Sequence, residues 1–358
     1  MNVLRLAGWL AERGLPVIIY GTAESPLARS AVTRQHPFRA LTKSGKYGGL
    51  FSGRSLGRML DNDGVTTLTI HNSGDILVSA LAAGFARNRP KLIFIQHMQL
   101  GSDKRDFLHT LQYRALDAWV TPLNILAESV KARTRIDPRK IHVIPHGIDL
   151  SVFTNNLPSR NEARRRLDLT PDAMIAGVVG RFDPKKGQET LVRAARIVGE
   201  RGHRLHLLFV GEETRNEQNG YLRSVRQLVA DSGMTELVHF RPFLDKIQFA
   251  YAAMNMFVLT SHSETYGMVT IEAMAAGLPV IVTNTGGTPG IVSDRVNGLL
   301  VPPHDPGALA DALCMLLGHP DTAASLSARA RKDALATYSH HAQCDRLEKL
   351  FADLTTAR

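Results

Sequence analysis

Short apolar runs rich in β-branched residues alternate along this chain with longer segments whose apolar residues recur every three or four positions. The segment 189–201 is of the second kind, with Leu191, Ala194, Ala195 and Val198 on one face of a predicted helix. The short runs, each a predicted strand, lie at 17–20, 67–70, 91–96, 118–122, 141–145, 175–180, 206–211, 237–240, 256–261 and 279–284. Alternating strands and helices predict an α/β protein with parallel sheets covered on both faces.

The strands fall into two groups, separated by a polar stretch from Asp149 to Asp172. The pattern therefore predicts two Rossmann-like domains that face one another across a cleft, where the carboxyl ends of the strands would bind ligands. The predicted parts are an N-terminal Rossmann-like domain, a linker, a C-terminal Rossmann-like domain and a C-terminal helix, over 1–150, 151–172, 173–335 and 336–358.

Composition narrows the class of protein. The chain has 358 residues, of which 44% are hydrophobic, and this excludes a disordered protein. The two cysteines, Cys314 and Cys344, are too few for a disulfide scaffold and indicate a reducing compartment. No apolar run approaches the roughly 20 residues that span a bilayer, and residues 1–14 lack the features of a signal peptide. We therefore expect a cytoplasmic protein.

Positive charge is concentrated in the first half. Residues 1–150 contain 20 Lys or Arg against 11 Asp or Glu, whereas residues 151–358 contain 23 against 22. This asymmetry indicates an anionic partner such as a phosphorylated acceptor, lipid headgroups or nucleic acid, or else a merely solubilising surface. Nucleic acid is disfavoured because only 6% of residues are aromatic and no RNA- or DNA-binding motif is present.

One basic segment, residues 39–60, mixes its cations with Gly, Phe and Leu. Such a mixture suits an anionic membrane surface or a phosphorylated glycan, and it equally suits a flexible surface loop. Its cations are Arg39, Lys43, Lys46, Arg54 and Arg58.

Two loops carry residues suited to a diphosphate sugar. Gly180 to Gly187, which follows a strand and precedes a helix, contains Arg181 and Lys186, and cations beside a helix N-terminus favour a diphosphate. A solvated basic turn is the alternative. The loop after strand 256–261 holds Glu264, and Glu272 follows eight positions later on a predicted helix. Carboxylates accept hydrogen bonds from sugar hydroxyls.

The same helix N-terminus supplies amides. Backbone N–H groups around Tyr266, Gly267 and Met268 could bind phosphate oxygens. Either glutamate taken singly could be an ordinary surface residue, but their combination with Pro279 and the later glycines favours a ligand site.

These motifs resemble those of retaining glycosyltransferases of family 4, glycosyl transferases group 1, which have the GT-B fold. The resemblance covers roughly residues 90–315. The matching motifs are G-R-x4-K-G at 180–187, E-x7-E at 264–272, E-A-M-A-A-G-L-P-V-I-V-T at 272–283, G-G at 286–287, N-G-L-L-V-P-P at 297–303 and I-P-H-G-I-D at 144–149.

The resemblance implies specific roles. Arg181 and Lys186 would neutralise the donor diphosphate, Glu264 would hold hydroxyls of the transferred sugar, and Glu272 would hold the ribose. The segment around Phe240 and Arg241 would meet the base, largely through its backbone. His97, after strand 91–96, would lie near the reaction centre. His71, His146 and His262 also follow strands, and we expect these three to be structural.

The resemblance further implies transfer of a hexose, with retention at the anomeric carbon, to a glycan or lipid-linked acceptor in lipopolysaccharide or other cell-envelope synthesis. A nucleotide-diphosphate sugar, with a UDP-sugar favoured, would be the donor, and neither cofactor nor metal is expected. Asp61-Asn62-Asp63 superficially resembles a D-x-D metal site, but it precedes Gly64 and is interpreted as a polar turn.

The N-terminal domain departs from the family pattern. The sequence starts at the helix that family members place after a first strand and a Gly-rich loop, so we expect that strand and loop to be lacking. The sequence leaves open whether this reflects a truncated chain or a lost part of the site, and the second case makes an inactive protein that binds a nucleotide sugar an alternative. A nucleotide-sugar epimerase of the same fold, which needs no acceptor, is a further alternative.

Overall fold

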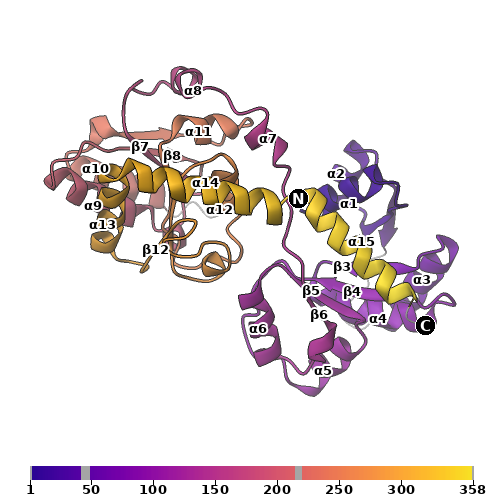
Figure 1. The fold of residues 1–358 in the computed structure, drawn as a ribbon. Helices are drawn as coiled ribbons and strands as arrows, with labels where there is room; N and C mark the ends of the chain where they lie inside the picture. The colour runs from indigo at the N-terminus through magenta and orange to yellow at the C-terminus, as the bar shows by residue number, and fades with distance from the viewer. Residues whose placement is uncertain (1, 42–48, 214–219, 357–358) are drawn as a thin grey trace. The chain divides into compact units, whose positions relative to one another are not determined.

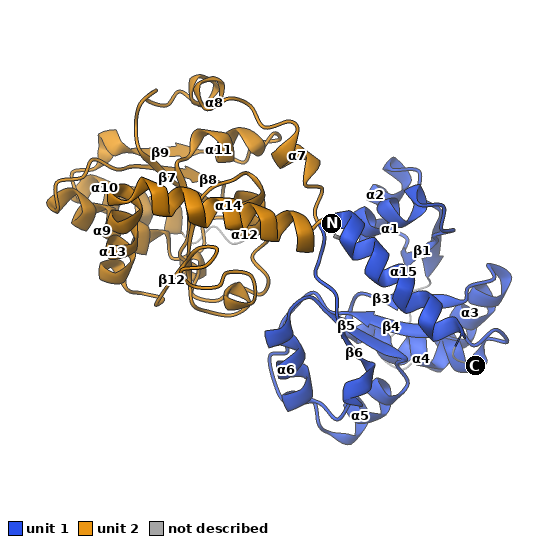
Figure 2. Cartoon of the chain, in the orientation of Figure 1, with its two compact units in different colours: residues 1–147, 340–358 blue, residues 148–339 orange. Residues whose placement is uncertain are grey.

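The computed structural model describes residues 2–41, 49–213 and 220–356. The chain forms two compact units, drawn in different colours in Figure 2. Unit 1 comprises residues 1–147 and 340–358, and unit 2 comprises residues 148–339.

Unit 1 contains a four-stranded parallel sheet with the order β3-β4-β5-β6. Its strands are β3 (Thr67–Ile70), β4 (Lys91–Ile95), β5 (Ala118–Thr121) and β6 (Ile141–Val143). One face is covered by α4 (Ile76–Phe85), α5 (Phe107–Arg114) and α6 (Asn124–Arg133). The other face is covered by α1 (Asn2–Glu12) and α15 (His340–Thr356) (Figure 1). Strands β4 and β5 are almost wholly buried because both faces are covered.

A second, two-stranded parallel sheet completes unit 1. Its elements are β1 (Ile19–Thr22), α2 (Pro26–Thr33) and β2 (Phe38–Leu41), followed by α3 (Gly49–Asn62). Helix α1 packs against both sheets, since Leu4 contacts the cluster around Ile19 and Leu6 the cluster of β4 and β5. No hydrogen-bonded ladder between described residues joins β1 to β3. The first described element is a helix, as the sequence predicts.

Unit 2 is built on a six-stranded parallel sheet with the order β12-β11-β10-β7-β8-β9. The strands are β7 (Ile175–Val179), β8 (His206–Val210), β9 (Val238–Arg241), β10 (Met256–Leu259), β11 (Val280–Thr283) and β12 (Leu299–Val301). Helices α9 (Gln188–Glu200), α10 (Tyr221–Asp231) and α13 (Pro306–Gly318) pack on one face of this sheet. The remaining helices are α7 (Ser151–Thr154), α8 (Arg160–Arg166), α11 (Gln248–Ala253), α12 (Met268–Ala275) and α14 (Pro320–Thr337). Short 3-10 helices lie at Ser73–Asp75, Pro138–Lys140, Pro184–Lys186, Thr235–Leu237 and Thr288–Gly290.

Each predicted strand overlaps an observed one, and two observed strands were missed. Strands β2 and β12 lie at sheet edges. They are short, and β2 is partly exposed along its whole length, so neither shows the long apolar run that marks a buried strand.

The unit boundaries differ from the predicted domain boundaries. The segment 151–172, predicted as a linker, contains α7 and α8 and belongs to unit 2. The reason is Arg164, which is 3% exposed and donates hydrogen bonds to Ala253 O at 3.1 Å and to Ala173 O at 2.8 Å. The C-terminal helix α15 belongs to unit 1, where Leu347 and Leu350 pack with β4 and β5.

No helix in the described part of the chain is both long and apolar enough to cross a membrane.

We expect Arg164→Ala to lower the free energy of unfolding of unit 2 by about 3 kcal/mol, because several buried acceptors lose their donor. Arg165→Ala is the matched control, since Arg165 is an exposed neighbour on the same helix. Urea unfolding followed by circular dichroism measures both. Equal stability of the two variants would contradict the role of Arg164 in joining α8 to the sheet.

Candidate functional site

The first site loop leaves the carboxyl end of β7. Asp183 accepts a hydrogen bond from the backbone N–H of Lys185 at 2.8 Å, which begins the short helix Pro184–Lys186. Arg181 Nη2 lies 3.1 Å from Asp183 Oδ2. Gly187 has a φ of +63°, and a Cβ added there would lie 2.3 Å from Thr260 O. Only glycine therefore allows this loop to sit against the end of β10.

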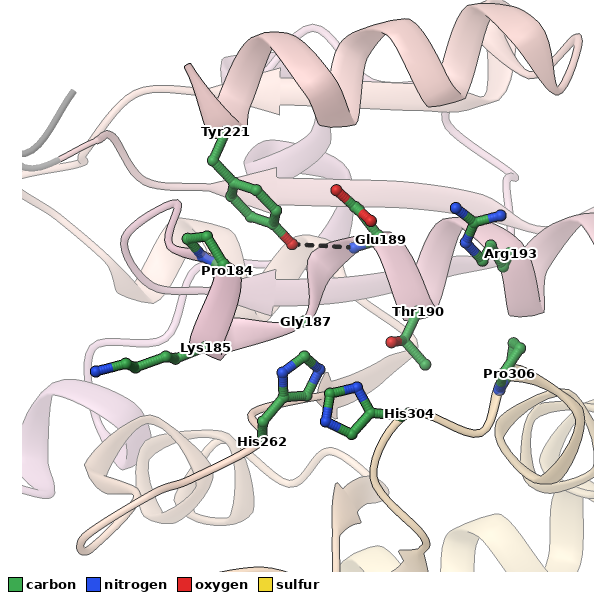
Figure 3. Close-up of a pocket in the computed structure, with 10 residues that line it drawn as sticks. All are labelled: Pro184, Lys185, Gly187, Glu189, Thr190, Arg193, Tyr221, His262, His304 and Pro306. Carbon is green, nitrogen blue, oxygen red and sulfur yellow. Dashed lines mark hydrogen bonds between the residues drawn. The ribbon is translucent and has the colours of Figure 1, made fainter. Parts of the chain in front are cut away.

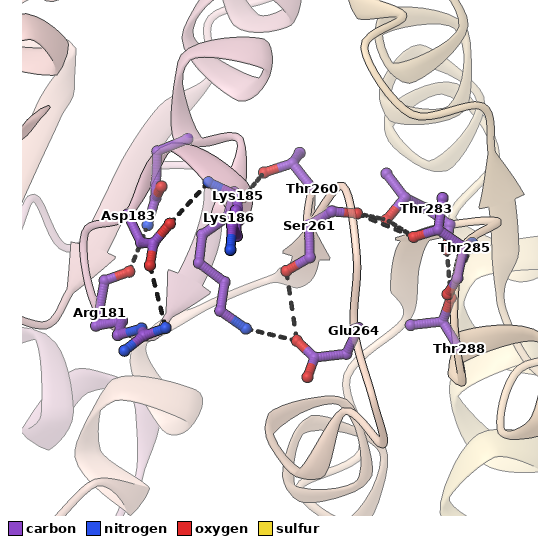
Figure 4. A network of polar contacts seen from close by, with 11 residues as sticks. Arg181, Asp183, Lys185, Lys186, Thr260, Ser261, Glu264, Thr283, Thr285 and Thr288 are labelled. Carbon is purple, nitrogen blue, oxygen red and sulfur yellow. Dashed lines mark hydrogen bonds and ion pairs between the residues drawn. The ribbon is translucent and has the colours of Figure 1, made fainter. Parts of the chain in front are cut away.

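The second site loop leaves the carboxyl end of β10 and meets the first. Lys186 Nζ lies 2.6 Å from Glu264 Oε2, and the two side chains are 24% and 15% exposed (Figure 4). Ser261 Oγ lies 3.4 Å from the same carboxylate oxygen. The Thr260 hydroxyl donates to Lys186 O at 2.9 Å. The structure thus brings the predicted cation and carboxylate together.

Threonines of the turn after β11 hold the second loop by its backbone. The hydroxyls of Thr283 and Thr285 both donate to Ser261 O, at 2.5 and 3.1 Å, and Thr288 donates to Thr285 O at 2.7 Å (Figure 4). Thr283 and Thr288 are buried, so these bonds are shielded from water. The sequence reasoning missed these threonines, although they flank the glycines that it singled out.

The glycines of the same turn lie against the backbone of Glu264. Gly287 N–H donates to Glu264 O at 2.7 Å. Gly286 has a φ of +57°, and a Cβ at this position would lie 2.0 Å from Glu264 O. The position of Glu264 therefore depends on a turn more than twenty residues downstream.

Helix α12 carries the other predicted residues of this site. Gly267, with a φ of +82°, precedes the first helical residue, Met268. Tyr266 is buried and makes an edge contact with Tyr338, with ring centroids 6.3 Å apart. These contacts fix the backbone that leads into the helix N-terminus.

Glu272, in the second turn of α12, accepts a hydrogen bond from the Tyr251 hydroxyl at 2.7 Å. Tyr251 comes from α11 and is fully buried. Burial and the neighbouring carboxylate raise the pKa of Tyr251 well above its ordinary value, so the proton of this pair stays on the tyrosine. This contact was not predicted, because no local sequence pattern relates Tyr251 to Glu272.

Phe240 and Arg241 lie on β9, and their side chains have structural contacts. Phe240 stacks on Phe209, with ring centroids 5.4 Å apart. The Arg241 Nε donates to Leu167 O at 2.8 Å, and its Nη2 donates to Asp168 O at 2.9 Å. If this segment binds the base of a nucleotide, it would do so through its backbone.

His97 lies in unit 1, directly after β4 and Gln96, in a stack of three histidines. Its Nε2 is 2.9 Å from His71 Nδ1, and its ring stacks on His146 with centroids 5.0 Å apart. The three residues follow β3, β4 and β6, whose carboxyl ends meet at one edge of the sheet. The sequence gives His71 and His146 no predicted role at the reaction centre, and the structure places both in contact with His97.

Burial keeps this stack neutral near neutral pH. Burial, together with the neighbouring imidazoles, lowers the pKa of His71 to about 3 and that of His146 to about 4. The pKa of His97 is also lowered, chiefly by burial. Neutral imidazoles can each donate one hydrogen bond and accept another.

Asp61 and Asn62, interpreted from the sequence as part of a polar turn, are the last residues of α3, and Asp63 follows the helix. Asp61 accepts hydrogen bonds from the backbone of Arg87 and Asn88, and Asp63 accepts one from the Tyr20 hydroxyl at 2.7 Å. Within the described ranges no group of three or more His, Cys, Asp or Glu gathers in a way that could hold a metal ion.

A cavity of about 570 Å³ lies beside the first site loop (Figure 3). Its lining includes Lys185, Arg193 and His262, but not Arg181, Lys186 or Glu264. His262 contacts His304, with ring centroids 3.5 Å apart. This cavity is therefore distinct from the meeting point of Lys186 and Glu264.

The parallel sheets of the two units, with cations, carboxylates and a helix N-terminus at the carboxyl edge of unit 2, are those of a GT-B glycosyltransferase. The chain belongs to the family 4 glycosyltransferases. Residues 159–333 match the family "Glycosyl transferases group 1", and residues 2–152 match "Glycosyltransferase Family 4".

Solved structures confirm the fold. A glycosyltransferase from Rickettsia africae superposes with a TM-score of 0.89 at 17% identity, covering 100% of this chain and 95% of that one. Anabaena HepE in complex with UDP superposes with a TM-score of 0.82 at 18% identity, covering 98% and 96%.

The matches to curated relatives cover only part of each relative. The D-inositol 3-phosphate glycosyltransferase of Actinosynnema mirum is 35% identical over 226 residues, which are 60% of this chain and 52% of that protein. The corresponding protein of Stackebrandtia nassauensis is 36% identical over 233 residues, 63% of this chain and 52% of that protein. The chain thus spans about half the length of the curated relatives it matches.

We expect acid to destabilise unit 1 through the histidine stack. The pKa values of His71 and His146 in the folded state lie below the unfolded value of about 6.5. The contribution of these two histidines to the free energy of unfolding is therefore fully present above that pH and is lost as the pH falls toward the folded pKa values. In that pH range each histidine lowers the free energy of unfolding by about 1.4 kcal/mol for each pH unit. Urea unfolding at a series of pH values measures the slope, and His71→Gln should reduce it; an unchanged slope would contradict this cause.

Proposed function

We propose that this protein transfers a hexose from a nucleotide-diphosphate sugar, with a UDP-sugar favoured, to a glycan or lipid-linked acceptor of the cell envelope. The observation that carries the proposal is the pair of Lys186 and Glu264, 2.6 Å apart beside the N-terminus of α12. Support also comes from relatives. HepE has been solved with UDP-glucose, and the lipopolysaccharide outer core galactosyltransferase WaaB superposes with a TM-score of 0.70 at 15% identity.

In this proposal the diphosphate is bound by Arg181, Lys186 and the amides at Gly267 and Met268. Cations and a helix N-terminus stabilise the negative charge that grows on the leaving diphosphate, and this lowers the barrier. Lys186 would exchange its contact with Glu264 for a phosphate oxygen. The released carboxylate oxygen would then accept a hydrogen bond from a hydroxyl of the transferred sugar.

Glu272 would hold the ribose. The Tyr251 hydroxyl donates to its Oε2, and each oxygen of a carboxylate can accept more than one hydrogen bond, so a ribose hydroxyl could bind to Glu272 as well. The backbone at Phe240 and Arg241 would face the base. Each part of the donor thus has its own group on the carboxyl edge of the unit 2 sheet.

The proposed transfer retains the configuration of the anomeric carbon and uses no metal. The acceptor hydroxyl oxygen bonds to the anomeric carbon on the face from which the diphosphate leaves, while the carbon–oxygen bond to the diphosphate breaks. The acceptor proton passes to an oxygen of the leaving diphosphate. His97 would hydrogen-bond the sugar near the reacting centre, held in place by His71 and His146.

We propose that this reaction takes place on the cytoplasmic side of the membrane, with the basic unit 1 toward anionic headgroups. Of the basic segment 39–60, Arg54 and Arg58 are exposed on α3, and Arg39 pairs with Asp63 at 3.2 Å. Lys43 and Lys46 lie outside the described residues.

The first test is release of nucleoside diphosphate from a panel of UDP-, ADP- and GDP-sugars, resolved by chromatography. We expect release from one donor, and a loss of about 10²-fold or more in Lys186→Ala, because a cation at the leaving group is removed. Lys185→Ala is the matched control, since this neighbouring cation lines the separate cavity.

Other outcomes of this screen contradict the proposal. A donor bound but left intact with every acceptor would indicate an inactive binding protein, and conversion of the sugar without an acceptor would indicate an epimerase. The anomeric configuration of the product, read by NMR, tests retention.

We expect Tyr251→Phe to raise KM for the donor about five-fold with little change in kcat, because one hydrogen bond that orients Glu272 is lost, which is worth about 1 kcal/mol. Steady-state kinetics at varied donor concentration measures both constants. A fall in kcat at unchanged KM would mean that Glu272 acts on the reacting atoms and not on the ribose.

A further inference from the structure

Helix α5 of unit 1 turns apolar side chains toward solvent. Phe107 is 82% exposed, Leu108 is 54% exposed and Leu111 is 53% exposed. We call these three residues the α5 apolar face. The buried side of the same helix is formed by Thr110 and Tyr113. A surface helix normally carries polar residues on its outward side, so the fold of unit 1 does not account for this face.

The α5 apolar face is held outward by the loop that precedes the helix. Asp106 caps α5 by accepting from the His109 N–H at 3.1 Å. The Lys104 N–H donates to Arg133 O at 2.8 Å, and Arg133 Nη1 donates to Leu100 O at 3.0 Å. Because these bonds join the loop to α6, the helix is fixed with its apolar face in solvent.

The same connection between β4 and α5 begins with His97. It continues through Met98, whose side chain is 76% exposed. His97 and the α5 apolar face thus lie on the same connection, with His97 near its start and Phe107 at its end.

The net positive charge of the chain comes from unit 1, which carries the α5 apolar face. Unit 1 contains 23 Lys or Arg against 13 Asp or Glu, a net charge of +10, whereas unit 2 contains 20 of each. Exposed cations close to α5 in the chain include Arg105 and Arg114. Two copies of unit 1 would repel one another through this charge, which argues against a second copy as the occupant of the face.

We infer that the α5 apolar face inserts into an anionic phospholipid bilayer, the surface that presents a lipid-linked acceptor to His97; this inference rests on the proposed function. A membrane anchor of useful strength combines apolar insertion with attraction of basic residues to anionic headgroups, and unit 1 supplies both. The surface differs from the basic segment 39–60, in which Leu50 and Phe51 on α3 are also exposed, at 58% and 81%.

The test is cosedimentation of the full chain with vesicles of phosphatidylcholine alone or mixed with phosphatidylglycerol. We expect binding to the anionic vesicles, reduced about tenfold or more in Phe107→Glu, because a charge replaces the inserted ring. Val32→Glu is the matched control: Val32 is 68% exposed on α2 of the same unit, and the substitution changes the charge equally. Binding of the control should match that of the wild type.

A second variant tests the inference even if Phe107→Glu does not fold. Phe107→Trp keeps an aromatic ring on the face, and its emission should shift to the blue and be quenched by brominated lipids in anionic vesicles. Equal binding by wild type and Phe107→Glu, or an emission unchanged by vesicles, would overturn the inference. So would a dimer that Phe107→Glu dissociates, without vesicle binding by the wild type.

Donor release without vesicles separates this inference from the proposed function. Phe107→Glu should release nucleoside diphosphate at the wild-type rate. Vesicle binding without donor release from any protein would leave the membrane surface in place and refute the transferase proposal, whereas donor release without vesicle binding would do the reverse.

Discussion

Strands β7 and β10 lie side by side in the middle of the unit 2 sheet, with Ala176 opposite Met256 and Gly177 opposite Phe257. Because the two strands are parallel, the loops that follow them leave from the same edge of the sheet. Lys186 on one loop and Glu264 on the other thus meet although 78 residues separate them. A Cβ at Gly177 would lie 2.2 Å from the side chain of Met254, so that side chain would have to move if the glycine were replaced. The contacts between the two site loops are built on this adjacency.

The ion pair does not hold the two loops by itself. A partly exposed pair of this kind contributes about 1 kcal/mol or less, whereas the buried bonds of Thr283 and Thr288 and the contact of Gly286 with Glu264 restrain the backbone. The charges are therefore free to change partners while the loops stay in place. This division suits the proposed exchange of Lys186 from Glu264 to a phosphate, since little of the stability of the loops depends on the bond that is exchanged.

In unit 1, too, the carboxyl ends of parallel strands bring distant residues together. Three strand ends bring His71, His97 and His146 together, and their mutual burial keeps them neutral. Outside this stack the unit is strongly basic, and α5 leaves Phe107 in solvent. A neutral, hydrogen-bonding centre on a cationic unit suits the proposed acceptor side, because the charge attracts an anionic surface without adding a proton to the imidazoles.

The sequence alone determined the α/β class, ten of the strands and the family, because buried parallel strands are long apolar runs and the site loops have fixed motif spacing. Glu264 and Glu272 could be assigned to one helix N-terminus for the same reason, and their roles, like that of His97, stay predictions. Tertiary structure alone decided that α15 belongs to unit 1, that Tyr251 bonds Glu272, that Thr283 restrains Ser261 and that two histidines flank His97. Each of these contacts joins segments far apart in the chain, and periodicity reports which face of an element is buried but not which partner covers it.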